Sequence, residues 1–328
     1  MVRLFRRNEP VSRSTRLALY YTSDVHGSER CFLKFLNAAK FYGVDTLILG
    51  GDLTGKVLVP IVESDGRWEM TFLGRHEVLA TPADVAEAEK RIRFNGFYPY
   101  RCDQQELARM EADPRYAAEV FRRTMWDAIE RWVRLAEERL RGSGVRCFIM
   151  PGNDDEFDID EALAQSDLVI NPDGRVVQLD GYQLLSLSWA NPTPWNSPRE
   201  LPEEELAARI ERLARELDPS VPAIFNLHCP PFNSTLDSAP QLREDLSVVM
   251  VGGQPNMVPV GSRAVRAALE RYQPVLSLHG HIHESRGAVR IGRTLCVNPG
   301  SAYGEGVLHG ALVVLEGDRV ASYQLVSG

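Results

Sequence analysis

The chain has 328 residues, with 45 acidic against 37 basic side chains, a formal net charge of −8 and 44% hydrophobic residues. This composition is that of a globular protein with a substantial core, and it excludes a disordered, collagen-like or low-complexity chain. No apolar run reaches the roughly 18 residues that a membrane span needs. The acidic balance argues against a general nucleic-acid coat protein, because such binding depends on neutralising phosphates.

The N-terminal segment and the cysteines bear on location. Residues 1–16 contain five arginines and lack the apolar core of a secretory signal. We predict a flexible tail there, with an organelle transit peptide as the alternative. The five cysteines are odd in number and form no CxxC pair, which predicts a reducing, cytoplasmic compartment: Cys31, Cys102, Cys147, Cys229 and Cys296.

Strands and helices alternate in the first half. Residues 17–23, 44–49 and 145–150 are apolar runs typical of buried strands. Residues 29–42 repeat apolar side chains at steps of three and four, which predicts a helix. This order predicts a β-α-β crossover in an α/β sheet.

An insertion at about residues 57–142 separates the second and third strands. Residues 57–63 and 67–73 alternate around Asp65-Gly66 and predict a hairpin. Two helices are predicted at residues 82–94 and 116–140, the second with one apolar face. We interpret the segment as a helical cap whose apolar face packs on the main body. A substrate lid is compatible with that packing.

The second half is richer in strands and predicts a second sheet packed on the first. Helices are predicted at residues 203–217 and 262–272. Strands are predicted at residues 176–179, 184–188, 223–227, 275–278, 288–291, 294–297, 311–315 and 320–325.

Metal-type side chains follow the ends of five predicted strands. They are Asp24 and His26, Asp52, Asn153 with Asp154 and Asp155, His228, and His279 with His281 and His283. Ligands of α/β sheets bind beyond the carboxyl ends of strands, so we expect these clusters to meet in one crevice. Each cluster taken alone is weak evidence for a metal site. The three imidazoles within five residues are the hardest to pack without polar partners.

The donor set is too large for one tetrahedral ion. Imidazoles and carboxylates suit zinc, iron, nickel or manganese. Three Asp/Asn oxygens and four imidazoles fit a pair of divalent ions about 3.5–4 Å apart that share a carboxylate.

The motif set D-x-H, G-D, G-N-x-D, H and G-H-x-H, in this order, resembles that of the calcineurin-like metallophosphoesterases. The resemblance spans about residues 17–300, outside the insertion, and Asn298-Pro299-Gly300-Ser301 resembles the NPGS turn of small bacterial members. It implies a four-layer α/β/β/α sandwich of two mixed sheets, with a single domain at residues 17–328 that carries the inserted cap.

The resemblance also implies a ligand set. Asp24, His26 and His283 would hold one ion, and Asn153, His228 and His281 the other, with Asp52 bridging them. Two cations lower the pKa of a bridging water, so that hydroxide can attack phosphorus in line. Asp52, Asn153 and Asp154 are the expected catalytic residues.

One position departs from the family. Asp154 stands where members usually have a His that protonates the leaving group. A carboxylate near two cations stays ionised and is a poor general acid. We therefore expect activity on esters with good leaving groups and weak activity on alkyl phosphates. Small family members that lack this His look like phosphodiesterases, so the resemblance implies a phosphodiesterase. The alternative is that Asp154 only caps the following helix.

Three further residues are candidates for supporting roles. Asp155 would support a ligand from behind. His279 would orient a ligand or phosphate, or else bond only to backbone. Asn191, in the Pro-rich loop that also holds Trp195, is a candidate substrate contact.

The leading hypothesis is a metal-dependent phosphoesterase that acts on a small phosphoester. Alternatives are a non-catalytic metal-binding scaffold, which Asp154 favours, a nuclease, which the acidic balance disfavours, and a protein phosphatase. No membrane partner is expected and nucleic acid is disfavoured. An exposed apolar stripe on the cap would indicate a homodimer.

Overall fold

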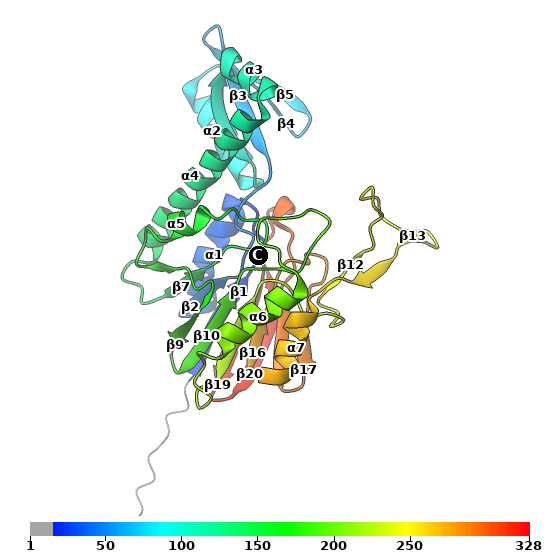
Figure 1. The fold of residues 1–328 in the computed structure, drawn as a ribbon. Helices are drawn as coiled ribbons and strands as arrows, with labels where there is room; N and C mark the ends of the chain where they lie inside the picture. Colours follow the sequence, from blue (N-terminus) through cyan, green and yellow to red (C-terminus); the bar gives the residue numbers. More distant parts are fainter. Residues whose placement is uncertain (1–15) are drawn as a thin grey trace, which may run out of the picture.

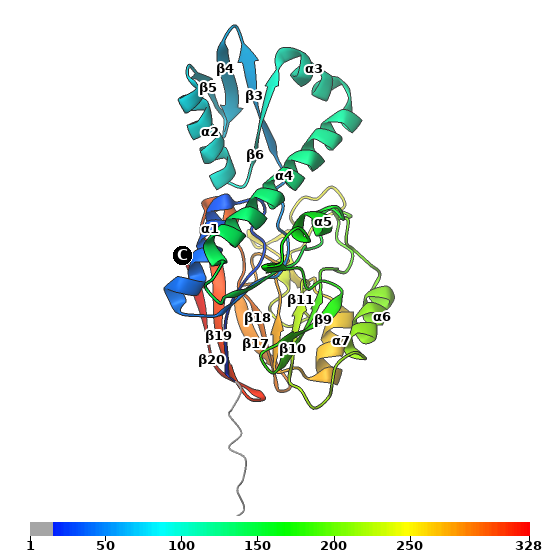
Figure 2. The ribbon, with the colours of Figure 1, turned by 90° about the vertical axis from the view of Figure 1, so that its left-hand side faces the viewer.

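Two six-stranded sheets lie face to face at the centre of the protein, in a computed structural model that describes residues 16–328 (Figures 1 and 2). The predicted tail, residues 1–16, lies outside the described residues except for Arg16. No helix in residues 16–328 has both the length and the apolarity needed to cross a membrane.

The first sheet has the strand order β20-β19-β1-β2-β7-β8. Its parallel centre is β1 (Arg16–Thr22), β2 (Thr46–Leu49), β7 (Arg146–Ile149) and β8 (Val169–Ile170). The C-terminal hairpin β19 (His309–Glu316) and β20 (Arg319–Ser327) extends it antiparallel to β1.

The second sheet has the order β17-β18-β16-β11-β10-β9 and is also mixed. Its strands are β9 (Arg175–Leu179), β10 (Tyr182–Leu187), β11 (Ala223–Leu227), β16 (Leu276–Leu278), β17 (Gly287–Ile291) and β18 (Thr294–Asn298). All eight strands predicted in the second half are present, because their apolar runs are bounded by turn residues.

Side chains from both sheets form a shared core, and helices cover the outer faces. Leu19 and Ile48 of the first sheet share one buried cluster with Leu184 and Leu276 of the second. The helices α1 (Glu29–Tyr42), α4 (Pro114–Leu140) and α5 (Ile159–Leu163) pack on the first sheet. The helices α6 (Glu203–Ala214) and α7 (Arg263–Tyr272) pack on the second. The predicted four-layer sandwich is thus confirmed.

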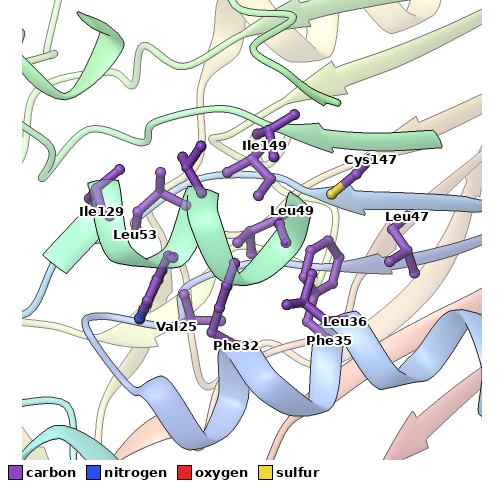
Figure 3. Packing of buried hydrophobic residues seen from close by; sticks show 14 of the residues in the cluster. Val25, Phe32, Phe35, Leu36, Leu47, Leu49, Leu53, Ile129, Cys147 and Ile149 are labelled. Atoms are coloured by element: carbon purple, nitrogen blue, oxygen red, sulfur yellow. The ribbon is translucent and has the colours of Figure 1, made fainter. Parts of the chain in front are cut away.

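The helix α1 links the first two strands. The hydroxyl oxygen of Ser28 caps its N-terminus by accepting a hydrogen bond from the backbone N–H of Cys31, and Gly43 ends it at φ 68°. Phe32, Phe35 and Leu36 point from one face of α1 into the core formed with β2 and β7 (Figure 3). This packing fixes the strand ends that carry the candidate ligands.

The insertion is a mixed α/β layer above the sandwich (Figure 2). Its sheet has the order β5-β4-β3-β6, with a core of its own that includes Ile61, Phe72 and Ile92. The elements are β3 (Leu58–Ser64), β4 (Arg67–Phe72), β5 (Arg75–Leu79), α2 (Pro82–Phe94), β6 (Tyr98–Asp103) and α3 (Gln104–Ala112), followed by α4. The predicted hairpin and both predicted helices are present. The strands β5 and β6 and the helix α3 were not predicted, because charged residues and Pro99 mask their pattern.

The apolar face of α4 packs inward. Met125, Ile129 and Trp132 are buried, and the Trp132 ring stacks on Phe32 with centroids 4.3 Å apart. The expected packing on the main body is therefore confirmed. The stripe is not exposed and gives no argument for a homodimer.

A narrow β-arm projects from the second half of the chain (Figure 1). It is built from β12 (Ser238–Pro240), β13 (Met250–Val251), β14 (Gln254–Pro255) and β15 (Met257–Pro259), paired two by two. A short 3-10 helix, η1 (Tyr303–Glu305), precedes β19.

Candidate metal centre

The clusters predicted from the sequence meet at one edge of the two sheets. The loops after β1, β2 and β7 come from the first sheet, and those after β11 and β16 from the second. These are carboxyl ends of parallel strands, where α/β folds place their ligand sites. The side chains form two neighbouring groups that share Asp52.

The first group is Asp24, His26, Asp52 and His283, whose ligand atoms all lie within 4.8 Å of one another. His26 Nε2 lies 3.6 Å from Asp52 Oδ2 and 3.1 Å from His283 Nε2. His283 Nε2 lies 3.4 Å from Asp24 Oδ1. Two carboxylates and two imidazoles therefore converge on one point.

The second group is Asp52, His228 and His281, with Asn153 between the two imidazoles. Asn153 Oδ1 lies 3.0 Å from His228 Nε2 and 2.7 Å from His281 Nδ1. His228 Nε2 lies 3.3 Å from Asp52 Oδ1, while Asp52 Oδ2 faces the first group. Asp52 thus reaches both groups with separate oxygens.

Backbone carbonyls fix two of the imidazoles. Nδ1 of His228 lies 3.0 Å from the carbonyl of Gly50, and Nδ1 of His26 lies 3.3 Å from that of Thr54. A carbonyl only accepts, so each Nδ1 carries a proton and each Nε2 faces the centre. Nε2 of His26 presents a lone pair there, whereas Nε2 of His228 is held protonated by Asp52 and must lose that proton before it can bind a cation. The lone pair of His26 is thereby aimed at His283. A cation fits between such donors, and the residue types suit divalent transition metals.

Four of the grouped residues have left-handed backbone conformations. The φ angles are 57° at Asp24, 38° at His26, 50° at Asp52 and 67° at His281. Such conformations are costly for residues other than glycine and concentrate at functional sites. The strain directs these side chains to a common point where a relaxed strand end would splay them.

Glycines next to the ligands leave room for them. A Cβ at Gly152 would lie 2.2 Å from Asp52 Oδ1, and one at Gly51 would lie 2.3 Å from His228 Nδ1. A Cβ at Gly280 would lie 2.3 Å from Asp24 Oδ2. The glycines of the G-D, G-N-x-D and G-H-x-H motifs are therefore required by close packing of the ligands.

The imidazoles of the cluster differ in protonation state, because their pKa values are shifted in opposite directions. Burial lowers the pKa of His26 and of His281 to about 4, in each case with help from a neighbouring imidazole. Burial also disfavours a charged His228, but the charge and hydrogen bond of Asp52 outweigh it and raise its pKa to about 10. Burial opposes ionisation of Asp24, yet His283 and its neighbours hold the pKa of Asp24 well below its ordinary value. The buried carboxylates are therefore stabilised by a positive charge at the centre, which a protonated imidazole or a metal ion can supply.

Asp155 supports the centre from behind. Its carboxylate accepts hydrogen bonds from the backbone N–H groups of Leu53, Thr54 and Gly152 and from the Thr54 hydroxyl, at 2.6–2.9 Å. Burial and the charge of Asp52 raise the pKa of Asp155. These bonds tie the Asp52 loop to the Asn153 loop, and the role of Asp155 in supporting a metal ligand stays a prediction.

Asp154 forms an ion pair and does not cap a helix. Its carboxylate contacts the Lys56 ammonium and accepts a hydrogen bond of 2.7 Å from the Ser197 hydroxyl. Its backbone N–H donates to Asp52 Oδ1 at 3.1 Å. Burial would raise the pKa of Asp154, but Lys56 outweighs it and lowers the pKa, so the group stays ionised. The N-cap of α5 is Asp158.

His279 and Asn191 lie apart from the ligand atoms. The Nδ1 of His279 bonds to the carbonyls of Leu227 and Cys229 at 2.9 and 3.1 Å, which matches its backbone-bonded interpretation. Burial lowers its pKa to about 4. The amide of Asn191 donates to the carbonyl of Val260, and its role as a substrate contact stays a prediction.

The NPGS turn holds the last ligand loop in place. The Asn298 side chain donates to the carbonyls of Gly280 and Ile282, and Ser301 Oγ donates to the carbonyl of Asp24 at 2.6 Å. Gly300 adopts φ 67°, and a Cβ there would meet the carbonyl of His283 at 2.8 Å. This turn therefore locks the His281–His283 segment against the Asp24 loop.

Three residues of the site escaped the sequence analysis: Lys56, Ser197 and Tyr303. Lys56 and Ser197 hold Asp154, and the Tyr303 ring lies 4.6 Å from that of His26. They come from a loop, a Pro-rich segment and η1, where no periodic pattern marks them. Of the three, only Lys56 could have been suspected from the sequence, because it lies four residues after Asp52 of the G-D motif.

A cleft of about 820 Å³ lies beside the candidate metal centre. It is lined by Thr54 and Asp154, by side chains of α4 and by residues 195–198, and by none of the seven candidate ligands. The volume falls in the range of small-molecule sites.

The comparisons with known proteins place the fold more firmly than the function. No family model matches the chain. It is 29% identical over 153 residues to the uncharacterized protein MJ1162 of Methanocaldococcus jannaschii. The aligned segment covers 46% of this chain and 62% of that relative. The chain thus spans about three fifths of the length of the curated relative it matches.

Solved structures with similar folds include TT1561 of Thermus thermophilus. That match has a TM-score of 0.52 at 15% identity and covers 96% of this chain and 99% of the other, which shows a shared fold alone. Yfce, a phosphoesterase from E. coli, aligns with a TM-score of 0.33 at 12% identity over 94% of this chain and 98% of the other. That likeness is too weak to carry an argument. The fold and site thus define an α/β sandwich protein with a candidate metal centre.

Proposed function

We propose that this protein is a dinuclear metallophosphoesterase that hydrolyses phosphodiesters. The observation that carries the proposal is Asp52, whose two oxygens face separate Asp/His groups at the carboxyl ends of the strands. A purely structural fold has no use for strained, buried acid and imidazole side chains at one point. The calcineurin-like resemblance of the motif set supports the same reaction class.

The residues would divide the work as follows. Asp24, His26 and His283 would hold one ion, Asn153, His228 and His281 the other, and Asp52 both. When bound, two divalent ions would activate a water and neutralise charge on the phosphoryl oxygens. Manganese, iron, zinc and nickel all suit these donors. Asp155 would keep Asp52 and Asn153 in register through its four hydrogen bonds.

Preference for diesters rests on Asp154. The pair with Lys56 and the bond from Ser197 keep this carboxylate ionised, so it has no proton to give to an alkoxide. Esters whose leaving groups depart without a proton are therefore the expected substrates. A small phosphodiester fits the cleft beside this residue.

The test is turnover of bis-p-nitrophenyl phosphate by protein loaded with manganese. We expect hydrolysis by the wild type and a loss of at least about a thousandfold in Asp52→Asn, because catalysis by positioned metals contributes several kcal/mol. Asp127→Asn, on the insertion and outside both groups, is the control. A wild type that binds two ions per chain and hydrolyses no ester would favour the non-catalytic scaffold instead.

A further inference from the structure

The cleft beside the metal centre is lined by side chains of α4 and by a tryptophan from another segment. Phe121 and Met125 line it from α4, between charged residues of the same helix, and Trp195 lines it from the loop after β10. Asp154 also lines it, and its backbone N–H is 3.1 Å from Asp52 Oδ1. A group attached to a phosphorus at the metal centre would therefore extend toward these side chains.

Trp195 is unusually exposed for its size. Its relative exposure is 65%, and no ring contact within residues 16–328 involves it. Its backbone N–H is held by the hydroxyl of Thr193 at 3.2 Å. An indole that packs on nothing contributes little to folding, and aromatic side chains presented in this way are typical of binding surfaces.

The loop that presents Trp195 is held rigidly. The Glu200 carboxylate accepts three hydrogen bonds, from the backbone and hydroxyl of Thr193 and from the backbone of Ser197, at 2.5–3.0 Å. Ser197 is in turn bonded to Asp154. Arg199, only 2% exposed, anchors the base of the loop to Asp160 and to the carbonyl of Asp155. The backbone that carries the indole is thus held in place relative to the metal centre before any ligand binds.

Cations lie along the same cleft. Arg115 and Arg122 line it from α4, and Lys56 lines it at the inner end. Arg122 lies 3.6 Å from Asp158, and Lys56 pairs with Asp154. The acidic side chains Glu119, Asp154 and Glu156 also line the cleft, so its formal charges balance. A planar ring that stacks on the indole fits such a lining, with the phosphate of the same compound at the metal centre.

We propose that this cleft selects phosphoesters that carry a nucleobase-type aromatic ring, and that Trp195 is the specificity-determining residue on which the ring stacks. The inference rests on the proposed function for the chemistry at phosphorus. The binding it describes can be measured without turnover.

The test compares two phosphate compounds that differ in the ring. Adenosine 5′-monophosphate and ribose 5-phosphate are titrated by calorimetry into manganese-loaded protein. We expect the nucleotide to bind at least about fivefold tighter, since stacking of a base on an aromatic residue is worth that much or more. Trp195→Ala should bring the ratio close to one with ribose 5-phosphate unchanged, and Trp195→Phe should keep most of it.

The control is Phe41→Ala, which removes an aromatic side chain that is 80% exposed on α1 and does not line the cleft. A ratio near one in the wild type, no measurable nucleotide binding, or a ratio that survives Trp195→Ala would each overturn the inference. Hydrolysis of bis-p-nitrophenyl phosphate with no preference for the nucleotide would leave the proposed function standing alone. Tighter binding of the nucleotide that is lost in Trp195→Ala would support the inference. If the same protein hydrolysed no ester, the proposed function would be refuted.

Discussion

Asp154 is the residue on which the proposed preference for diesters rests. It is ionised, paired with Lys56 and bonded to Ser197, and its backbone N–H donates to the Asp52 carboxylate. Its side chain therefore holds a cation beside the candidate metal centre, at the position where the family that the motifs resemble usually has a histidine.

Replacing Asp154 by His is predicted to add a general acid. Asp154→His should raise turnover of an alkyl phosphate monoester by at least about tenfold, because positioned general acids contribute about a hundredfold or more when well aligned. Asp154→Asn removes the charge without supplying a proton and is the matched control. Equal monoesterase activity in both variants would show that the missing proton donor does not limit the reaction.

The residue types of the centre could be predicted from the sequence, while their partners could not. Asp24, His26, Asp52 and His281 stand out because each lies at the end of an apolar run, and the last three adjoin a glycine. Lys56 meets Asp154 across 98 positions of chain, and no local pattern encodes such a contact. Long-range pairs form only when the sheet is assembled.

At the scale of elements, α4 joins the insertion to the sandwich. Its 27 residues correspond to about 40 Å at 1.5 Å per residue, so its N-terminal half lies in the insertion and its C-terminal half on α1 (Figure 2). The same helix lines the cleft with Phe121 and Met125. The stacking of Trp132 on Phe32 thus positions the α4 side chains that line the cleft.

Truncating Trp132 is predicted to weaken this junction. Trp132→Ala should lower the free energy of unfolding by about 3–5 kcal/mol, the cost of removing a large buried aromatic side chain. Trp132→Phe should cost less, because a ring remains and the indole N–H has no partner. Urea denaturation measures both. Arg134→Ala, at an exposed position on α4, should stay within about 0.5 kcal/mol of the wild type; a similar loss there would mean that the loss in Trp132→Ala does not come from removing a buried ring.

Elements with strong periodicity could be predicted from the sequence, and short polar ones could not. The helix at 82–94 has the same bounds in the structure, since Thr81 and Pro82 mark its start. The strand β6 contains Pro99 and charged residues and forms because β3 pairs with it in parallel. Its pairing partner, not its own propensity, decides its conformation.

For the whole molecule, the buried imidazoles predict acid sensitivity. His26, His279 and His281 have pKa values of about 4 in the folded protein against 6.5 for a free imidazole. The unfolded chain therefore binds more protons between these values. The stability that these three imidazoles contribute is fully present above pH 6.5 and is lost as the pH falls toward 4. His228, whose pKa is raised to about 10, acts in the opposite direction above pH 6.5 and does not oppose the loss at acid pH.

We expect the metal-free protein to lose stability across this window, measured by urea denaturation at pH 7, 6 and 5 with a chelator present. The His279→Asn variant should lose less, by about one proton or roughly 1.4 kcal/mol per pH unit. His76→Asn, at an exposed imidazole outside the centre, should follow the wild type. Parallel pH profiles for His279→Asn and the wild type would mean that His279 is not held neutral by burial.

The sequence by itself determined the class of fold and the residue types of the centre, because apolar periodicity and strand-end motifs are local signals. Only the tertiary structure decided which donors face each other, how Asp52 reaches both groups, and where Lys56, Trp195 and Tyr303 lie. Those relations depend on the register of two sheets and on the docking of α4, which arise from packing between segments far apart in the chain.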